Sequence, residues 1–267
     1  MQNKTIKIIF FGDIVGSLGR KAVKEIVPLW QKEYAPDLMI ANIENLAHGK
    51  GVTLKTVEEI KSTGIQLFSG GNHIWAKESI EDIAAQTHFP IALPANDSQT
   101  TDNYLWQDLE IKGQKIVLLS FSGRTFMKDD NLSNPFLKAD ELIKKFPDSI
   151  IIVDFHAEAS SEKRAFGLYL DGRVSAVLGT HTHVPTNDAQ ILNQGTGYLT
   201  DIGMIGSYPS VIGVKSEIII NKFLSDEPNG RHEFADSGQI ELNAVLLEVD
   251  TVSKKTVQIQ NLRQILS

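Results

Sequence analysis

Side chains that bind metal ions or move protons recur close to the ends of five short apolar runs in this sequence. They are Asp13, Glu44 and Asn45, Asn72 and His73, His156, and the pair His181 and His183. Carboxylates, amide oxygens and imidazoles suit iron, manganese, zinc or nickel, and no soft sulfur ligand stands among them. A carboxylate can also bridge two cations, because each of its oxygens can bind one ion. The residue types therefore indicate a centre for two metal ions.

Two such ions, about 3.5–4 Å apart, can clamp a phosphoryl group and lower the pKa of a bound water, so that a metal-bound hydroxide attacks phosphorus. Each fragment alone has an ordinary explanation. Asp13 could be a turn aspartate, and Asn72 with His73 could be a helix cap and a core histidine. The pair His181 and His183 suits a loop or a strand rim, where alternate residues point the same way. Their joint occurrence at five strand ends is what favours a metal site.

The elements that would position these groups are short and apolar nearly throughout. Such runs predict strands buried on both faces, in sheets covered by helices. The predicted strands are Ile8–Phe11, Leu38–Ile43, Ile65–Ser69, Ile116–Phe121, Ile150–Phe155 and Val174–Leu178, and the predicted helices are Lys21–Tyr34, Leu54–Ser62, Lys77–Gln86 and Ala139–Phe146. Ligand sites of α/β sheets lie beyond the carboxyl ends of strands, so parallel neighbours would bring the groups together.

The last part of the chain has a different pattern, with three predicted strands and little helix between them. These strands are Ile218–Phe223, Ile240–Val249 and Thr256–Leu262. The expected fold class is therefore α/β, as a four-layer α/β/β/α sandwich of mixed sheets with helices outside. Residues 1–267 are interpreted as a single domain. The polar stretches Asp97–Asn103 and Ser225–Gly238 are expected to be surface loops.

Composition narrows the range of partners and compartments. The chain has 267 residues, a formal net charge of −7 and no cysteine. The negative charge argues against strong non-specific binding to nucleic acids, and the lack of cysteine favours a reducing compartment. The first apolar run stops at Gly12 and no run reaches the ~20 residues that span a bilayer, so a cytoplasmic protein without a membrane anchor is expected. A homo-oligomer stays possible.

The order of the fragments resembles the calcineurin-like metallophosphoesterase superfamily, which carries GDxH, GDxxD, GNH(E/D), a later lone His and GHxH. Two positions depart from that pattern, because Val15 replaces a metal-binding histidine and Glu44 replaces a bridging aspartate. Both departures resemble the YmdB-like branch, a group of bacterial 2′,3′-cyclic-nucleotide phosphodiesterases. The stretches FGDIVGSLGR, IENLAHGKG, GGNHIW, DFHAEASSEK and LGTHTHVPT are also similar to that branch.

The resemblance implies a metallophosphoesterase fold and two metal ions, iron or manganese above all. It implies that the first ion binds Asp13, Glu44, Asn45 and His183, and that the second binds Glu44 as the bridge, Asn72, His156 and His181. His73 would then act as the general acid that protonates the leaving oxygen. The substrate would be a small nucleotide or another phosphate ester.

Several assignments stay open at this stage. His48, in a glycine-rich loop, either contacts the substrate or is a solvated loop histidine. Thr180 and Thr182 either orient the neighbouring imidazoles or are ordinary strand-rim residues, which is the preferred interpretation. Glu158 either contacts the metal ligands or, as we expect, opens the next helix. The same core would also suit a phosphomonoesterase, a protein phosphatase, or a regulatory metal-binding protein of RNA turnover with little catalysis.

Overall fold

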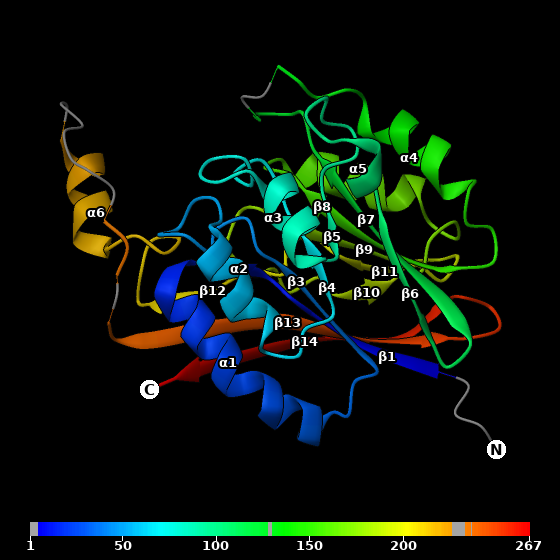
Figure 1. Ribbon diagram of the computed structural model, residues 1–267, viewed down its shortest axis with the longest axis horizontal. Coiled ribbons are helices and arrows are strands. Elements are labelled where there is room, and N and C mark those ends of the chain that lie inside the picture. The colour runs from blue at the N-terminus through cyan, green and yellow to red at the C-terminus, as the bar shows by residue number, and fades with distance from the viewer. Residues whose placement is uncertain (1–4, 128–129, 226–232, 236) are drawn as a thin grey trace.

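The computed structural model describes residues 5–127, 130–225, 233–235 and 237–267. Two sheets pack face to face, as Figure 1 shows. The first sheet has the order β2 (Asp13–Ile14), β12 (Met204–Tyr208), β13 (Gln239–Asp250), β1 (Thr5–Phe11), β3 (Leu38–Asn42), β4 (Leu67–Ser69) and β5 (Ile91–Ala92), with β14 (Thr256–Leu266) paired to β13. The second sheet has the order β10 (Gln190–Ile191), β11 (Gly197–Leu199), β9 (Ala176–Thr180), β8 (Ile150–His156), β7 (Gln114–Ser122) and β6 (Gln107–Ile111).

Helices cover the outer faces of both sheets. They are α1 (Gly16–Glu33), α2 (Leu54–Lys61) and α3 (Ile80–Thr87) on the first sheet and α4 (Pro135–Ile143) and α5 (Ser160–Tyr169) on the second, with a 3-10 turn at Asp102–Tyr104 and a further helix α6 (Ser216–Leu224). Helix α6 projects away from the sandwich at the left of Figure 1. Among the residues described, no helix is both long and apolar enough to cross a bilayer.

Strand β1 shows how the sequence produces this layering. Its side chains alternate, so that Ile9 and Phe11 pack against the helices of the first sheet while Ile8 and Phe10 pack against the second sheet. Phe11 stacks on Trp30 of α1 with ring centroids 5.5 Å apart. A third apolar cluster lies between the second sheet and its own helices. Three apolar interfaces separate four layers, which confirms the predicted α/β/β/α sandwich.

The strands that precede the candidate ligands are parallel within each sheet. Strand β1 runs parallel to β3 and β3 to β4, while β7, β8 and β9 are parallel in the second sheet. The carboxyl ends of both sets meet at the same end of the sandwich, since Ser120 of β7 donates to the carbonyl of Gly70, which follows β4, at 2.9 Å. This meeting of two sheet ends positions the site.

One predicted strand is wrong. Ile218–Phe223 lies inside helix α6, which runs over Ser216–Leu224. Its β-branched isoleucines favour a strand in sequence. However, no strand pairs with this segment in the described part of the chain, and its ends carry Glu217 in the first turn and Lys222 in the last. That charge order suits a helix dipole, so the local end signals predicted the structure better than β propensity did.

Several boundaries also differ from expectation, and helix α4 covers Pro135–Ile143 rather than Ala139–Phe146. Helix α1 begins at Gly16 rather than Lys21, because the glycines of this stretch allow close packing: a Cβ at Gly19 would collide with the carbonyl oxygen of Ile205 in β12. In the expected loop Asp97–Asn103, Asp97 is buried and bridges Leu132. Of the expected loop Ser225–Gly238, residues 226–232 and 236 lie outside the described residues.

Candidate metal centre

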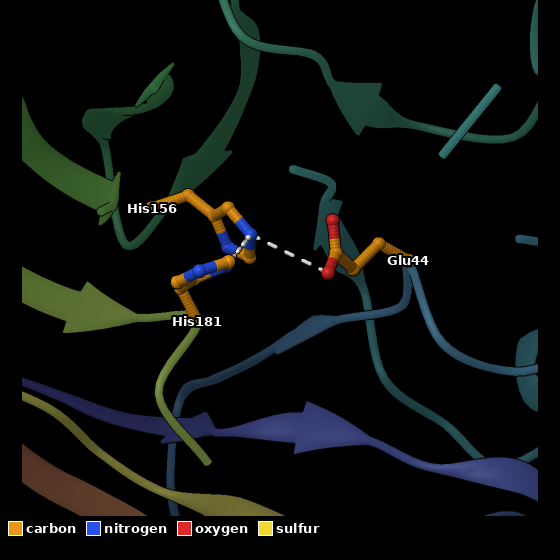
Figure 2. Close-up of side chains that lie close together, drawn as sticks. All are labelled: Glu44, His156 and His181. Atoms are coloured by element: carbon orange, nitrogen blue, oxygen red, sulfur yellow. Dashed lines mark hydrogen bonds and ion pairs between the residues drawn. The ribbon is translucent and has the colours of Figure 1, made fainter. Parts of the chain in front are cut away.

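Four predicted ligands from both sheets meet around one nitrogen atom. We call Glu44, Asn72, His156 and His181 the His156 cluster. His156 Nε2 lies 3.0 Å from Asn72 Oδ1, 3.0 Å from His181 Nδ1 and 3.3 Å from Glu44 Oε1. Figure 2 shows Glu44, His156 and His181 directed toward one another. Ligand atoms about 2.1 Å from one ion lie about 3.0–3.4 Å apart in octahedral or tetrahedral sites, so this spacing could hold a metal ion.

The backbone leaves room for this cluster at Gly71. A Cβ at that position would collide with the imidazole ring of His156. The two ring nitrogens of His156 also have separate neighbours, because Nδ1 lies 2.9 Å from the hydroxyl of Thr180 while Nε2 faces the cluster. Thr180 is thus buried and contacts a candidate ligand, in contrast to the ordinary rim position that we preferred.

The remaining predicted ligands lie beside this cluster. We call Asp13, Glu44, Asn45 and His183 the Asn45 cluster. Asn45 Nδ2 lies 3.1 Å from Glu44 Oε1 and 3.2 Å from His183 Nε2. Asp13 is buried, and its Oδ2 accepts a hydrogen bond from the backbone N–H of His181 at 3.1 Å. Its Oδ1 is buried without a hydrogen-bond partner among the described residues. A buried carboxylate oxygen without a donor fits the binding of a cation.

The amide of Asn45 has its nitrogen turned toward Glu44 and His183. Its Oδ1 instead lies 2.9 Å from His73 Nδ1, the ring nitrogen that donates to it. Only an amide oxygen can bind a cation. The amide must therefore rotate by half a turn before Asn45 can serve as a ligand, which exchanges its two ends in nearly the same space.

The loop that carries His181 and His183 is held by a buried ion pair. Lys163 of α5 lies 2.5 Å from Asp201 Oδ2 and donates to the carbonyl of Thr180 at 2.7 Å. Asp201 Oδ2 also accepts from the backbone N–H of Thr182 at 3.1 Å. These bonds fix the loop directly after β9.

Both histidines of that loop have left-handed backbones, with φ of 98° at His181 and 64° at His183. Such conformations cost on the order of 1–3 kcal/mol for a residue with a side chain. They send the two rings to different groups, since His181 joins the His156 cluster and His183 reaches Asn45 and the carbonyl of Ile212. The two rings therefore point in different directions, whereas in an extended backbone they would point the same way.

Burial and neighbouring charges shift the pKa values of the two acidic groups in opposite directions. Burial raises the pKa of the Asp13 carboxyl well above its usual value, and the neighbouring carboxylate of Glu44 raises it further, against an opposing effect of His156. Burial also raises the pKa of Glu44, but the rings of His156 and His73 outweigh it and hold the pKa below its ordinary value. A cation at this place would favour the charged form of both groups.

The histidines respond in opposite directions. Burial lowers the pKa of His156, but the carboxylate of Glu44 more than offsets it and raises the pKa to about 9. Burial and the neighbouring His156 lower the pKa of His181 to about 3, and burial lowers the pKa of His183. His181 and His183 thus offer neutral rings, whereas an ion bound to His156 must first displace a proton.

His73 and His48, the other two predicted site residues, differ in their contacts. The backbone N–H of His73 donates to Glu44 Oε2 at 2.9 Å, and its side chain is 32% exposed. His48 is exposed and lines a small pocket with Val15 and Phe234. Within the described residues, no hydrogen bond joins His48 to either cluster. The structure thus brings His73 to the centre and leaves the substrate role of His48 a hypothesis.

Glu158 contacts a candidate ligand, which is the less favoured of the two interpretations that the sequence offers for this residue. Helix α5 begins at Ser160, and Glu158 lies before its N-cap rather than opening it. Its Oε2 is 3.2 Å from His181 Nε2, the ring nitrogen on the far side of the His156 cluster. The position of Glu158 two residues after His156 indicates a possible contact with the ligands, but His181 is its partner because of how the loop after β9 folds back.

Comparisons with known proteins show what the whole chain is similar to. A family model described as YmdB-like protein matches residues 9–262. A 2′,3′-cyclic-nucleotide 2′-phosphodiesterase of Bacillus subtilis (strain 168) is 42% identical over 261 residues, 96% of each chain. A crystal structure of a novel phosphatase from Mycoplasma pneumoniae is 35% identical with a TM-score of 0.90, covering 100% of this chain and 95% of that one.

A more distant structure shares the fold alone. The NAD nucleotidase of Haemophilus influenzae matches with a TM-score of 0.56 at 14% identity, over 98% of this chain and 56% of that one. It supports the fold class, while the family model over residues 9–262 and the 42% identity confirm the YmdB-like resemblance. The chain belongs to the YmdB-like family.

Proposed function

We propose that this chain is a metal-dependent phosphoric ester hydrolase that cleaves phosphodiesters, with 2′,3′-cyclic nucleotides as its substrate class. The observation that carries the proposal is the central place of Glu44, whose Oε1 lies 3.3 Å from His156 Nε2 and 3.1 Å from Asn45 Nδ2. One carboxylate is thus common to both clusters. The substrate class rests on the 42% identity to the Bacillus subtilis 2′,3′-cyclic-nucleotide 2′-phosphodiesterase.

The His156 cluster and the Asn45 cluster would each hold one ion. The oxygen and nitrogen ligands suit iron, manganese, zinc or nickel, and the family resemblance favours iron or manganese among them. When bound, a pair of ions supplies positive charge to the phosphoryl oxygens and lowers the pKa of a water. Glu44 would bridge the pair. Asp13, with its buried oxygen, would balance part of the added charge.

His73 is proposed to protonate the leaving oxygen of the ester. The backbone N–H of His73 donates to Glu44 Oε2 at 2.9 Å, which holds the residue beside the shared carboxylate, and its side chain reaches solvent at the edge of the centre. A protonated imidazole in this position can donate a proton while an ester occupies the clusters. General acids of this kind contribute about 10²–10⁴-fold to the rate.

The test compares His73→Gln with the unchanged protein, both loaded with Mn²⁺. We expect the variant to bind as many equivalents of metal as the unchanged chain but to hydrolyse a 2′,3′-cyclic nucleotide about 10²–10⁴-fold more slowly. Glutamine keeps the backbone contact to Glu44, so loss of metal is not expected. Near-full turnover with the metal retained would rule out His73 as the acid.

A second candidate function is hydrolysis of phosphomonoesters. It is supported by the similarity to the structure from Mycoplasma pneumoniae, whose name is phosphatase. The two activities differ in whether the substrate phosphorus carries one ester bond or two. Turnover on p-nitrophenyl phosphate, bis-p-nitrophenyl phosphate and a 2′,3′-cyclic nucleotide separates them. The first proposal predicts preference for the two diesters. A clear preference for the monoester would replace it with the second.

A further inference from the structure

A carboxylate is buried between the two sheets, beside the centre but outside both clusters. Asp154 lies within the apolar strand β8 and is fully buried. Its Oδ2 accepts hydrogen bonds from Asn42 Nδ2 at 3.0 Å and from the hydroxyl of Ser69 at 2.5 Å. Its Oδ1 accepts from the hydroxyl of Thr180 at 2.6 Å. A buried charge is costly, so three directed donors around one carboxylate indicate a specific use.

The bond to Thr180 determines where the proton of His156 lies. A threonine hydroxyl has one hydrogen, and here it points to Asp154 Oδ1. The same oxygen lies 2.9 Å from His156 Nδ1, so it must accept there, and Nδ1 must carry a hydrogen. With the Asp154 carboxylate charged, the opposite arrangement would set two lone pairs against each other at 2.6 Å. His156 therefore keeps its hydrogen on Nδ1 and directs Nε2 to the cluster.

The carboxylate also contacts the turn that carries Glu44. Asn42 donates to Asp154 through Nδ2, while its Oδ1 accepts from the backbone N–H of Glu44 at 3.1 Å. One buried group thus connects the first sheet, which supplies Glu44, with the second sheet, which supplies His156. Neither connection passes through an ion.

We propose that Asp154 is a positioning residue that, through Thr180, holds the proton of His156 on Nδ1 and so presents Nε2 for metal binding. The inference rests on the metal centre of the proposed function, and it concerns ion binding rather than turnover. Partners of this type typically change metal affinity about 10–100-fold when they are removed. A purely structural role would lower stability without changing the tautomer.

The first measurement needs no substitution. The chain is labelled with ¹⁵N in its histidine rings, loaded with diamagnetic Zn²⁺ and studied by NMR. We expect one imidazole N–H signal that exchanges slowly with water and belongs to Nδ1 of His156. A proton on Nε2 instead, or no protected Nδ1–H signal, would overturn the proposal.

The second measurement compares Thr180→Val with Thr180→Ser. Valine keeps the branched shape of threonine and removes the hydroxyl, whereas serine keeps the hydroxyl. We expect Thr180→Val to lose the protected Nδ1–H signal and to bind the tighter Zn²⁺ ion about 10–100-fold more weakly in a calorimetric titration. Thr180→Ser should keep both within a few-fold. Unchanged signal and affinity in folded Thr180→Val would contradict the proposal.

Asp154→Asn tests the carboxylate itself. An asparagine here must direct its NH₂ group either at the Asn42 amide nitrogen or at the Thr180 hydroxyl, and each is a donor to Asp154 now. If the NH₂ group faces Thr180, the hydroxyl turns to His156 Nδ1 and the ring hydrogen moves to Nε2. We expect weaker Zn²⁺ binding with a changed ring spectrum, while weaker binding with an unchanged spectrum would reduce Asp154 to a structural role.

The outcomes separate this inference from the proposed function. If the unchanged chain binds Zn²⁺ with Nδ1–H protected but hydrolyses no phosphodiester, the proposed function fails and the positioning role stands. If it is an active diesterase with the proton of His156 on Nε2, the positioning role fails and the function stands.

Discussion

The His156 cluster and the Asn45 cluster share Glu44 but differ in their readiness to bind a cation. Around His156, an amide oxygen, a carboxylate oxygen and a second ring nitrogen all lie within 3.3 Å of Nε2. Around Asn45, an NH₂ group lies between Glu44 and His183, and Asp13 Oδ1 is buried without a donor among the described residues. The first group is already arranged for an ion, and the second must rearrange.

The difference shows which interactions arrange a metal site in advance. The His156 cluster is supported by hydrogen bonds from both sheets, through Thr180 and Asp154. Asn45, in contrast, turns its oxygen to His73, since that ring nitrogen is the donor within reach. We therefore expect ions to bind in two steps, with the His156 cluster as the tighter site.

The largest effect is expected from replacing Glu44, the residue that both clusters share. Glu44→Gln keeps the size of the side chain but removes its charge, so both clusters should bind metal far more weakly than the about 10–100-fold change typical of outer partners. Turnover should fall to background with the fold retained. Elemental analysis after dialysis, together with circular dichroism, measures metal and fold. Retention of two equivalents would show that Glu44 is not the shared ligand.

Asn45→Ala should weaken metal binding in the Asn45 cluster and leave the His156 cluster unchanged. The Asn45 cluster loses a ligand, and the His156 cluster keeps all four of its members. We expect a calorimetric Mn²⁺ titration to lose the weaker binding step and to keep the tighter one within a few-fold. Asn45→Asp is the matched control, because either oxygen of a carboxylate can bind the ion without rotation, and it should keep both steps. Loss of both steps in Asn45→Ala would contradict the separation of the clusters.

The affinity of the His156 cluster for a cation should depend on pH through one of its two histidines. The pKa of His156 is raised to about 9, so below that pH an ion entering the His156 cluster displaces a proton. The affinity of the tighter site should therefore fall by up to about tenfold for each pH unit below 9. His181, with a pKa lowered to about 3, stays neutral and adds no dependence. Calorimetry near pH 7 in buffers of different ionisation enthalpy should show about one proton released, and none released would contradict the assignment.

The smallest effect is expected at Glu158. Its carboxylate lies 3.2 Å from His181 Nε2, but the side chain is half exposed, and exposed pairs contribute about 0–1 kcal/mol. Glu158→Gln should weaken the tighter Zn²⁺ step by less than about fivefold and leave the weaker step unchanged. A loss as large as that of Glu44→Gln would mean that Glu158 is itself a ligand.

The sequence predicts most of the framework for a clear physical reason. Strands buried on both faces are apolar throughout, so the polar residues that end them stand out, and parallel strands bring those ends together. Family and fold class are confirmed on that basis, and the enzyme class, phosphoric ester hydrolase, agrees with the names of the relatives. The ligand roles stay predictions, although the distances connect six of the seven side chains in two adjoining clusters and Asp13 accepts a hydrogen bond from the backbone N–H of His181.

What could not be predicted depends on contacts between distant segments. Asp154 interrupts an apolar strand two residues before His156 and on the same face, but its partners Asn42, Ser69 and Thr180 come from three other strands that no spacing rule connects. The rotation of the Asn45 amide depends on His73 and His183, which no spacing rule connects. The helix at 216–224 was mistaken for a strand because β-branched residues favour strands only where a partner strand exists.

The central claim is that Glu44 joins two cations at the end of the sandwich. A crystal structure of the Mn²⁺-loaded chain, with anomalous scattering at the manganese edge, tests it most directly. We predict two anomalous peaks about 3.5–4 Å apart, with Glu44 between them, Asn72, His156 and His181 around one, and the amide oxygen of Asn45 turned toward the other. A single peak, or two peaks without a common contact to Glu44, would contradict the account.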